Sequence, residues 1–390
     1  TGAHGHGAVQ ARRPRVTEAR EQQARVQYQR GAANRSLAAA LAEADASLQK
    51  ARDLDGVVEA LQPLGAGGDE LKFDYSTLWM QIGGAAALIV IALFVAFTPG
   101  EFGYGTRGFT GFVWILLMLG LAMGGVALRK IWSKSSRIPD LTEMALSRAA
   151  LFSNGLTWTA GPAEEIRASL TKRFGDYKRG NYSRDITRAY DGTLKTESGD
   201  RPFQYVQLHY VDRREEVYYE TDSNGRQVQK TRIVYDHFDR FSVVVPGCNA
   251  RNVTVASDNS APVAWKTVWP TTLKEFNRRF TVSGETEMAC AKFARPATIL
   301  HIQTMDGYFG GLNIEYDEQG DLCVSFNNGN ILNRRDPDVT LKHPVRFIEA
   351  ISHGIELPNL DAALALIRIL VEKSTDSFRD VAPETPPKGD

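Results

Sequence analysis

Two long apolar runs stand out in the hydrophobic pattern of this chain. They extend from Thr77 to Phe97 and from Phe109 to Leu128, and neither contains a charged side chain. Each has about twenty residues, which at roughly 1.5 Å of rise per residue matches the ~30 Å hydrocarbon thickness of a bilayer. A helix buried in a soluble core is usually shorter and carries a polar face. The pattern therefore predicts two membrane-spanning helices, at 77–97 and 109–128.

The segment between the runs, 98–108, has the Pro and Gly content of a loop that turns the chain round. We therefore expect the two helices to form a transmembrane hairpin. The first run lies too far along the chain to be a signal peptide. Small residues allow close helix contact in lipid, within the hairpin or with another protein. The interaction candidates of this kind are Gly83, Gly84, Gly120 and Gly124.

Basic residues near the ends of the spans predict the orientation, because cytoplasmic flanks carry an excess of Lys and Arg. The loop holds Arg107 alone, whereas four basic residues follow the second span: Arg129, Lys130, Lys134 and Arg137. Both termini of this multi-pass protein are therefore expected in the cytoplasm, with 98–108 outside. Three cysteines without paired spacing fit a reducing compartment.

The stretch before the first span is rich in good helix formers and predicts a helical, coiled-coil-like segment at 15–62. An a/d pattern runs through it at alternating steps of four and three: Leu37, Leu41, Ala44, Leu48 and Ala51. Two interpretations remain open, a helix that packs on its own domain and a stalk or self-association helix. Residues 1–14 predict a disordered basic arm, either solvated or near anionic lipid headgroups.

The pattern after Pro139 is that of a globular domain, which we expect at 140–375. Strand-like runs come in hairpins, one around the Asn224-Gly225 turn signal and another around Glu318–Gly320, with helices before and after them. Hairpins instead of βαβ units indicate antiparallel sheet. The predicted fold class is thus α+β: an N-terminal helical arm, a two-span helical hairpin, and a cytoplasmic domain of antiparallel sheet plus helices. A disordered tail is expected at 376–390.

The order of these parts resembles a known bacterial family. The passage "LKEFNRRFTVSGETEMACAKFARPATILHIQ", followed by the hairpin "LNIEYDEQGDLCVSF", is similar to the domain of unknown function numbered 3137. The resemblance extends over roughly 71–371 and is most specific at 274–301, while "VYDHFDRFSVVVPGCN" departs from the family pattern. It implies a protein of the bacterial inner membrane, in a family with some members encoded near LemA-like membrane proteins. It implies no activity.

The net charge and the candidate catalytic residues limit the classes of function that this chain can have. Lys+Arg and Asp+Glu are equal at 46 each, which argues against a nucleic-acid partner. The densest polar group is "YDHFDRF", where His237 and Asp239 share one face of a strand. A histidine beside carboxylates fits a general base or half a metal site, but charges on a strand are more often a solvated face or cross-strand ion pairs. No second ligand accompanies them at metal spacing, so we expect neither a metal site nor a cofactor. Cys290 and Cys323 are expected in apolar strands and Cys248 in an exposed turn.

These patterns favour a membrane-anchored cytoplasmic adaptor or accessory subunit that is not an enzyme. Its expected partners are membrane lipids and either a membrane protein or further copies of itself. One alternative is a membrane-tethered domain that senses a lipid or ligand, and another is a tethered hydrolase using the His237 region. A cleft around His237 would favour the hydrolase, a cavity in the domain would favour the sensor, and an exposed apolar patch would favour the adaptor.

Overall fold

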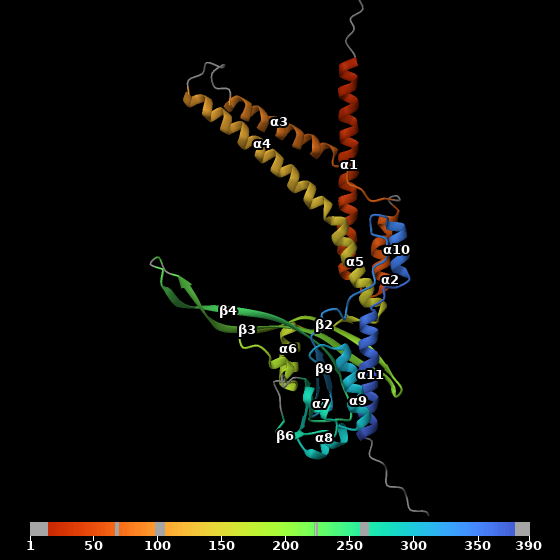
Figure 1. Cartoon of the computed structure of the whole chain (residues 1–390). Helices are drawn as coiled ribbons and strands as arrows, with labels where there is room; N and C mark the ends of the chain where they lie inside the picture. The colour runs from red at the N-terminus through yellow and green to blue at the C-terminus, as the bar shows by residue number, and fades with distance from the viewer. Residues whose placement is uncertain are drawn as a thin grey trace, which may run out of the picture. The chain divides into compact units, whose positions relative to one another are not determined.

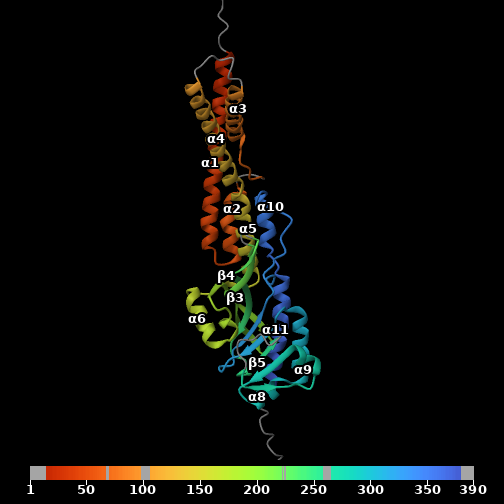
Figure 2. The same cartoon turned by 60° about the vertical axis from the view of Figure 1, so that its left-hand side comes forward.

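The computed structural model describes residues 15–66, 70–97, 106–221, 223, 225–257 and 265–378 (Figures 1 and 2). The predicted arm at 1–14, most of the loop at 98–108, most of the tail at 376–390 and Asn224 lie outside the described residues. Within the described residues, helices combine with antiparallel sheet, so the predicted mixed class is confirmed.

The helices follow the apolar and capping patterns, with several differences from the predicted bounds. The segment expected at 15–62 forms two helices, because the Asp53 side chain accepts a hydrogen bond from the Gly56 amide (2.8 Å) and starts a new one. The helices of the described residues are α1 (Arg15–Lys50), α2 (Leu54–Gly65), α3 (Ser76–Phe97), α4 (Thr106–Ser135), α5 (Arg137–Ser153), α6 (Ala163–Arg173), the 3₁₀ turn η1 (Asp176–Lys178), α7 (Lys274–Arg279), α8 (Glu287–Phe293), α9 (Pro296–Tyr308), α10 (Pro344–Ser352) and α11 (Pro358–Phe378).

The strands join one antiparallel sheet in the order β1-β2-β3-β4-β9-β8-β5-β7-β6. Hairpins give the neighbours β2–β3, β3–β4 and β8–β9, whereas the pairing of β4 with β9 joins segments far apart in the chain. The strands are β1 (Thr157–Trp158), β2 (Ser183–Thr196), β3 (Gly199–Thr221), β4 (Gln227–Val245), β5 (Val253–Ser257), β6 (Thr267–Trp269), β7 (Phe280–Gly284), β8 (Asn313–Tyr316) and β9 (Leu322–Phe326).

The chain divides into two compact units, with bounds that differ from the single domain expected at 140–375. The first unit comprises residues up to Ala149 together with Asp336–Gly354, and the second comprises Ala150–Arg335 with the residues from Ile355 onward. Most of α5 and all of α10 therefore belong to the same unit as α1–α4. The insertion of 336–354 into the first unit is a long-range contact that no local pattern signals.

The a/d pattern of α1 is buried inside the first unit. Leu41, Ala44 and Leu48 are almost fully buried, and α2 contributes Val57 and Leu61 to the same core. Leu37, at the start of the pattern, is half-buried. Burial within one chain matches the first of the two interpretations of this segment, a helix that packs on its own domain.

Helices α3 and α4 are each long and apolar enough to cross a membrane. The qualifying segments are Ser76–Ala96 and Gly111–Ser153, and the second is long because α4 and α5 are separated by Ser136 alone. Large apolar side chains on both helices are exposed in the isolated chain, among them Phe94 and Ile115. Such exposure has a large free-energy cost in water and none in hydrocarbon.

Helices cover both faces of the sheet in the second unit (Figure 1). Val206, Leu208 and Val244 point to the face where α6 adds Leu170 and Phe174. The intervening side chains point to the opposite face because side chains alternate along a strand. Helices α9 and α11 lie on that side of the sheet (Figure 1). Both faces of the central strands β4, β9 and β8 are therefore buried. These strands hold the residues at their ends in fixed positions.

The structure corrects two expectations about cysteines. Cys290 lies in helix α8 and not in a strand, although it is fully buried. Cys248 was expected in an exposed turn but is 4% exposed, and this burial raises the pKa of its thiol to about 12. Cys323 is buried in β9, as expected. Buried thiols with raised pKa values are poor nucleophiles.

Candidate functional site

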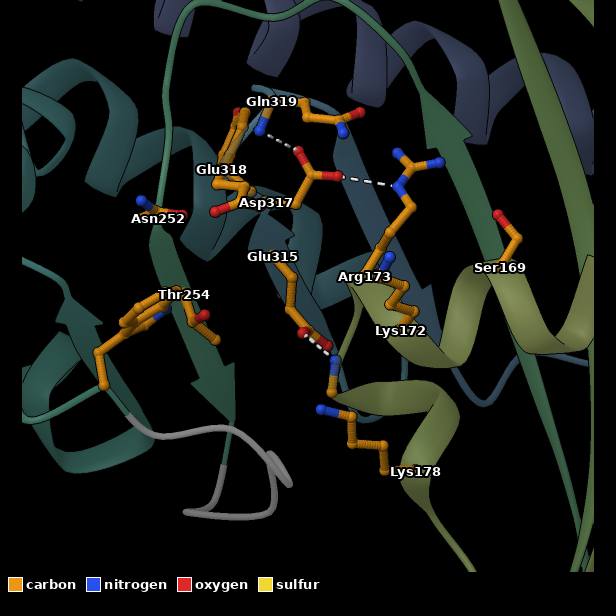
Figure 3. A pocket seen from close by; sticks show the side chains of 13 residues that line it. Ser169, Lys172, Arg173, Lys178, Asn252, Thr254, Glu315, Asp317, Glu318 and Gln319 are labelled. Carbon is orange, nitrogen blue, oxygen red and sulfur yellow. Dashed lines mark hydrogen bonds and ion pairs between the residues drawn. The ribbon is translucent and has the colours of Figure 1, made fainter.

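A polar cavity of about 630 Å³ lies in the second unit, between the end of α6 and the turn that joins β8 to β9 (Figure 3). One side is helical, with Lys172, Arg173 and Lys178, and the opposite wall is the start of β5, with Asn252 and Thr254. The remaining lining residues are Ser169, Gly175, Trp265, Glu315, Tyr316, Asp317, Glu318 and Gln319. The cavity is of the size that accepts a small organic ligand.

Glu315 lies at the bottom of the cavity. Its carboxylate accepts hydrogen bonds from the backbone amides of Gly175 (2.6 Å) and Asp176 (2.9 Å), at the turn between α6 and η1 (Figure 3). Burial, and then the nearby Asp176 carboxylate, raise the pKa of Glu315 to about 7. Both protonation states of this group are therefore populated near neutral pH, and the protonated state can donate a hydrogen bond.

A network of buried charged residues surrounds Asp176, the residue whose amide donates to Glu315. The Asp176 carboxylate accepts hydrogen bonds from Arg240 (2.7 Å), Arg179 (2.6 Å) and the Asn313 amide (2.7 Å). Burial opposes the charged form of Asp176, but the guanidinium groups of Arg240 and Arg179 outweigh it and lower its pKa. Arg240 also donates to the Gly311 carbonyl (2.7 Å). The network ties η1 to strands β4 and β8 and so holds the cavity bottom in place.

The turn beside the cavity is held by a second set of ionic contacts. Arg173 pairs with Asp317 (2.9 Å) and with Asp321. The Asp317 carboxylate also accepts from the backbone amides of Gln319 (2.9 Å) and Asp321 (2.8 Å). Two carboxylates thus neutralise Arg173, and these ion pairs fix the turn between β8 and β9 to the end of α6.

Several polar groups remain available to a ligand. Lys172 and Lys178 are exposed at the cavity and form no ion pair within the described residues. The Thr254 hydroxyl belongs to a residue only 2% exposed that lines the cavity, and it has no hydrogen-bond partner in the part of the chain that the structure describes. Asn252 adopts φ 50°, a backbone conformation that Asn tolerates better than most residues. The arrangement can bind a small polar molecule with anionic groups.

The predicted His237–Asp239 pair lies elsewhere, on the exposed part of the β3–β4 hairpin. His209 joins it across the sheet, through Nδ1 to Asp239 Oδ1 (3.0 Å) and through Nε2 to His237 Nδ1 (3.2 Å). His209 thus lies beside His237 in space, although it is distant from it along the sequence. Register could have revealed it, since β3–β4 pairing places His209 opposite Asp239. No group of residues suited to a metal ion occurs within the described ranges.

The four candidate glycines fall into two pairs. A Cβ atom at Gly120 would lie 2.8 Å from Ile89 Cγ1 and 3.0 Å from the Ala85 carbonyl, so α4 packs closely on α3 there. Gly124 also faces Ala85, at 3.6 Å from its Cβ. Gly83 and Gly84 face open space. The pair on α4 thus packs against α3, whereas the pair on α3 takes no part in this contact.

Comparison with protein-family models, with curated proteins and with solved structures finds no match. The resemblance to the family numbered 3137 therefore stays a prediction.

Proposed function

We propose that the chain is a membrane-anchored adaptor or accessory subunit of a membrane protein assembly, with no catalytic activity of its own. Helices α3 and α4 would form its anchor, and the second unit would meet the partner on the cytoplasmic side. The observation that carries this proposal is the outer part of the β3–β4 hairpin, which we call the ribbon: residues 212–221 and 227–236.

The ribbon extends past the strands that flank it. The pairing of β2 with β3 ends at Ser183 and Val211, and the pairing of β9 with β4 begins at Phe241. Beyond these points the two strands pair only with each other, over the register from Asp212–Asp236 to Thr221–Gln227. The ribbon projects from the rest of the second unit (Figure 1). A two-stranded hairpin is only marginally stable alone in water, so an arm of this length is unusual without a binding role.

The two faces of the ribbon differ in chemistry. One face carries ion pairs, Arg214–Asp236 (2.5 Å), Arg232–Glu216 (2.6 Å) and Lys230–Glu220 (2.6 Å). The opposite face presents exposed apolar side chains, with exposed fractions between 43% and 65%: Val217, Tyr219, Ile233 and Tyr235. Aromatic and aliphatic side chains gathered on one exposed face are typical of a protein contact surface.

The experiment removes the apolar face and keeps the fold. Tyr219→Ser with Ile233→Thr should detach the partner that co-purifies with the full chain in mild detergent, because both changes take apolar contact area from the same face. The matched control is Arg214→Gln with Arg232→Gln on the charged face, which should keep the partner. Retention of the partner by the first double variant, with its circular dichroism unchanged, contradicts the proposal.

A hydrolase based on His237 has less support. The imidazoles of His209 and His237 stack on an open sheet face, with ring centroids 5.4 Å apart, and neither residue lines the polar cavity. We therefore expect His237→Ala and Asp239→Asn to leave the cellular function intact. Loss of function in a variant that still folds and inserts would favour the enzyme over the adaptor.

A second candidate function, ligand sensing, is favoured by the polar cavity. Inorganic phosphate and small carboxylates should raise the thermal midpoint of the full chain in detergent, because Lys172 and Lys178 attract anions and Thr254 can hydrogen-bond to them. The double variant Lys172→Ala with Lys178→Ala should abolish the shift in the thermal midpoint. The control variant Lys195→Ala removes an exposed lysine of β2 that does not line the cavity, and it should keep the shift. No shift with any of these anions would count against sensing of an anionic ligand.

A further inference from the structure

A second cavity, of about 510 Å³, lies in the first unit beside the start of α3 and the junction of α4 with α5. It involves no residue of the polar cavity. Its walls come from the extended segment before α3, from α5 and from the segment 336–342. The lining is mainly apolar, with eight such side chains: Leu71, Phe73, Tyr75, Ile138, Pro139, Leu146, Pro337 and Val339.

Hydrogen bonds hold the walls of this cavity in place. The Leu71 amide donates to the Lys342 carbonyl (2.8 Å), and the Leu341 amide donates to the Thr142 hydroxyl (3.3 Å). The Asn34 side chain donates to the Asp74 carbonyl (2.8 Å) and accepts from the Asp74 amide (2.9 Å). The extended segment is thus fixed to both α1 and the 336–342 segment, and the cavity is preformed.

The position of the cavity along α4 matches the headgroup layer of a bilayer. Tyr75 directly precedes α3, and Lys134 lies six residues after Leu128, the end of the charge-free run. Six residues of helix rise about 9 Å, whereas the headgroup region of each leaflet is roughly 5–8 Å thick. If α3 and α4 span the membrane, the cavity therefore opens at the outer edge of the headgroup layer, where a long lysine side chain reaches the lipid phosphates.

Lysines surround the apolar lining. Lys72, Lys134 and Lys342 all line the cavity. The Lys134 ammonium lies 5.8 Å from the ring centroid of Phe73, and Lys342 pairs with Glu70 at 3.1 Å on the exposed side. Two carboxylates also line the cavity, Glu143 and Asp336, and each already interacts with another group. With Glu70 counted, three ammonium groups face three carboxylates, and Lys72 and Lys134 are the two ammonium groups that form no ion pair within the described residues.

We propose that this cavity binds one anionic phospholipid, with the phosphate at Lys72 and Lys134 and the adjoining apolar part of the lipid against Phe73 and Ile138. The inference rests on the proposed membrane anchor and adds a specific lipid partner to it. Apolar walls without charge would accept any lipid, and lysines on an open surface would attract anionic lipid without holding one molecule. The combination in one preformed cavity favours a single bound anionic lipid.

The test measures lipid retention by native mass spectrometry of the full chain in mild detergent. Phosphatidylglycerol, phosphatidylethanolamine and phosphatidylcholine with identical acyl chains are added separately. We expect one retained phosphatidylglycerol per chain, with about 25-fold weaker retention of the other two lipids, as two lysines at a lipid surface would give. Equal retention of the three lipids, or retention of several phosphatidylglycerol molecules in place of one, would overturn the proposal.

Variants locate the binding to the cavity. Lys72→Ala and Lys134→Ala should each weaken phosphatidylglycerol retention about fivefold. The control Lys130→Ala removes an equivalent charge at the end of α4 from a residue that does not line the cavity, and retention should be unchanged. An equal loss in Lys130→Ala would show diffuse attraction and refute the site.

Filling the cavity gives an independent measurement. Val339→Trp should abolish retention of the single lipid, whereas Val345→Trp, at a 53% exposed position of α10, should not. Thermal midpoints confirm that both variants fold. If the chain inserts in membranes and keeps its protein partner but retains no lipid, this inference alone fails. If the chain does not insert, the proposed anchor fails as well.

Discussion

At the residue scale, Glu315 makes stability depend on pH in an unusual direction. Its pKa rises from the ordinary value of 4.5 to about 7, so between these values the folded chain binds more protons than the unfolded chain. Stability from this group is therefore present below pH 4.5 and is lost as the pH rises through 7. Burial lowers the pKa of His301, which acts in the opposite direction near pH 6.5.

Comparison of Glu315→Gln with the natural sequence isolates the contribution of Glu315 to the pH dependence of stability. We expect the variant to gain stability relative to the natural chain as the pH rises from 5 to 8, by on the order of 1–3 kcal/mol. Thermal midpoints of the two proteins, measured at each pH in the same detergent, report the difference. A difference that stays constant with pH would show that Glu315 is ionised throughout.

Arg240 is expected to be the most sensitive charged residue of the second unit. Its side chain and that of Asp176 are 4% and 2% exposed, so Arg240→Met leaves a buried carboxylate with one fewer cation. The expected loss is about 3–5 kcal/mol. The control Arg232→Met breaks an exposed ion pair of the ribbon and should cost under ~1 kcal/mol. Denaturant unfolding of the full chain in detergent measures both, and equal losses would contradict the assigned role of the network.

The burial and the contacts of single residues were the hardest features to predict from the sequence. The strand prediction for Cys290 failed because α8 is a short helix, in which an apolar run fits both periodicities. The burial of Cys248 depends on the β8–β9 turn, where its amide donates to the Gly320 carbonyl (2.7 Å). Asp176 and Glu315 come together from distant segments and carry no local signal. His209 could have been found from the register of one hairpin.

At the element scale, α3 and α4 pack through Gly120. Gly120→Val should weaken or separate the hairpin, because the added side chain would overlap Ile89 and the Ala85 carbonyl. The matched control is Gly125→Val on the same helix, where a Cβ atom has no neighbour within 4 Å among the described residues. Disulfide cross-linking between cysteines placed on α3 and α4 measures the separation. Equal cross-linking in both variants would contradict the packing.

The elements themselves were largely predictable where local chemistry determines them. The charge-free run at 77–97 predicted α3 to within one residue, whereas α4 extends from Thr106 to Ser135, seven residues beyond the predicted end at Leu128. The a/d pattern of α1 showed which face is apolar, but not what covers it. Leu41 and Leu48 turn out to be buried in their own unit, so charged substitutions there would unfold it and would not test self-association.

At the scale of the whole molecule, sequence predicted the mixture of helix and antiparallel sheet but not the division into units. Hairpin signals are local, whereas the neighbours β4–β9 and β5–β8 depend on contacts across long stretches of chain. The packing of residues 336–354 in the first unit also depends on long-range contacts. It also forms one wall of the proposed lipid site, which no motif in the sequence indicates.

The proposed function requires that both large flanks of the hairpin lie on the same, cytoplasmic side of the membrane. Cysteine labelling in intact cells with a membrane-impermeant reagent tests this most directly. The natural background should be low, because Cys248, Cys290 and Cys323 are all buried. We predict labelling of Gly103→Cys in the loop, and labelling of Ser198→Cys, in the exposed β2–β3 turn, only after the cells are permeabilised. Labelling of Ser198→Cys in intact cells, with Gly103→Cys protected, would contradict the account.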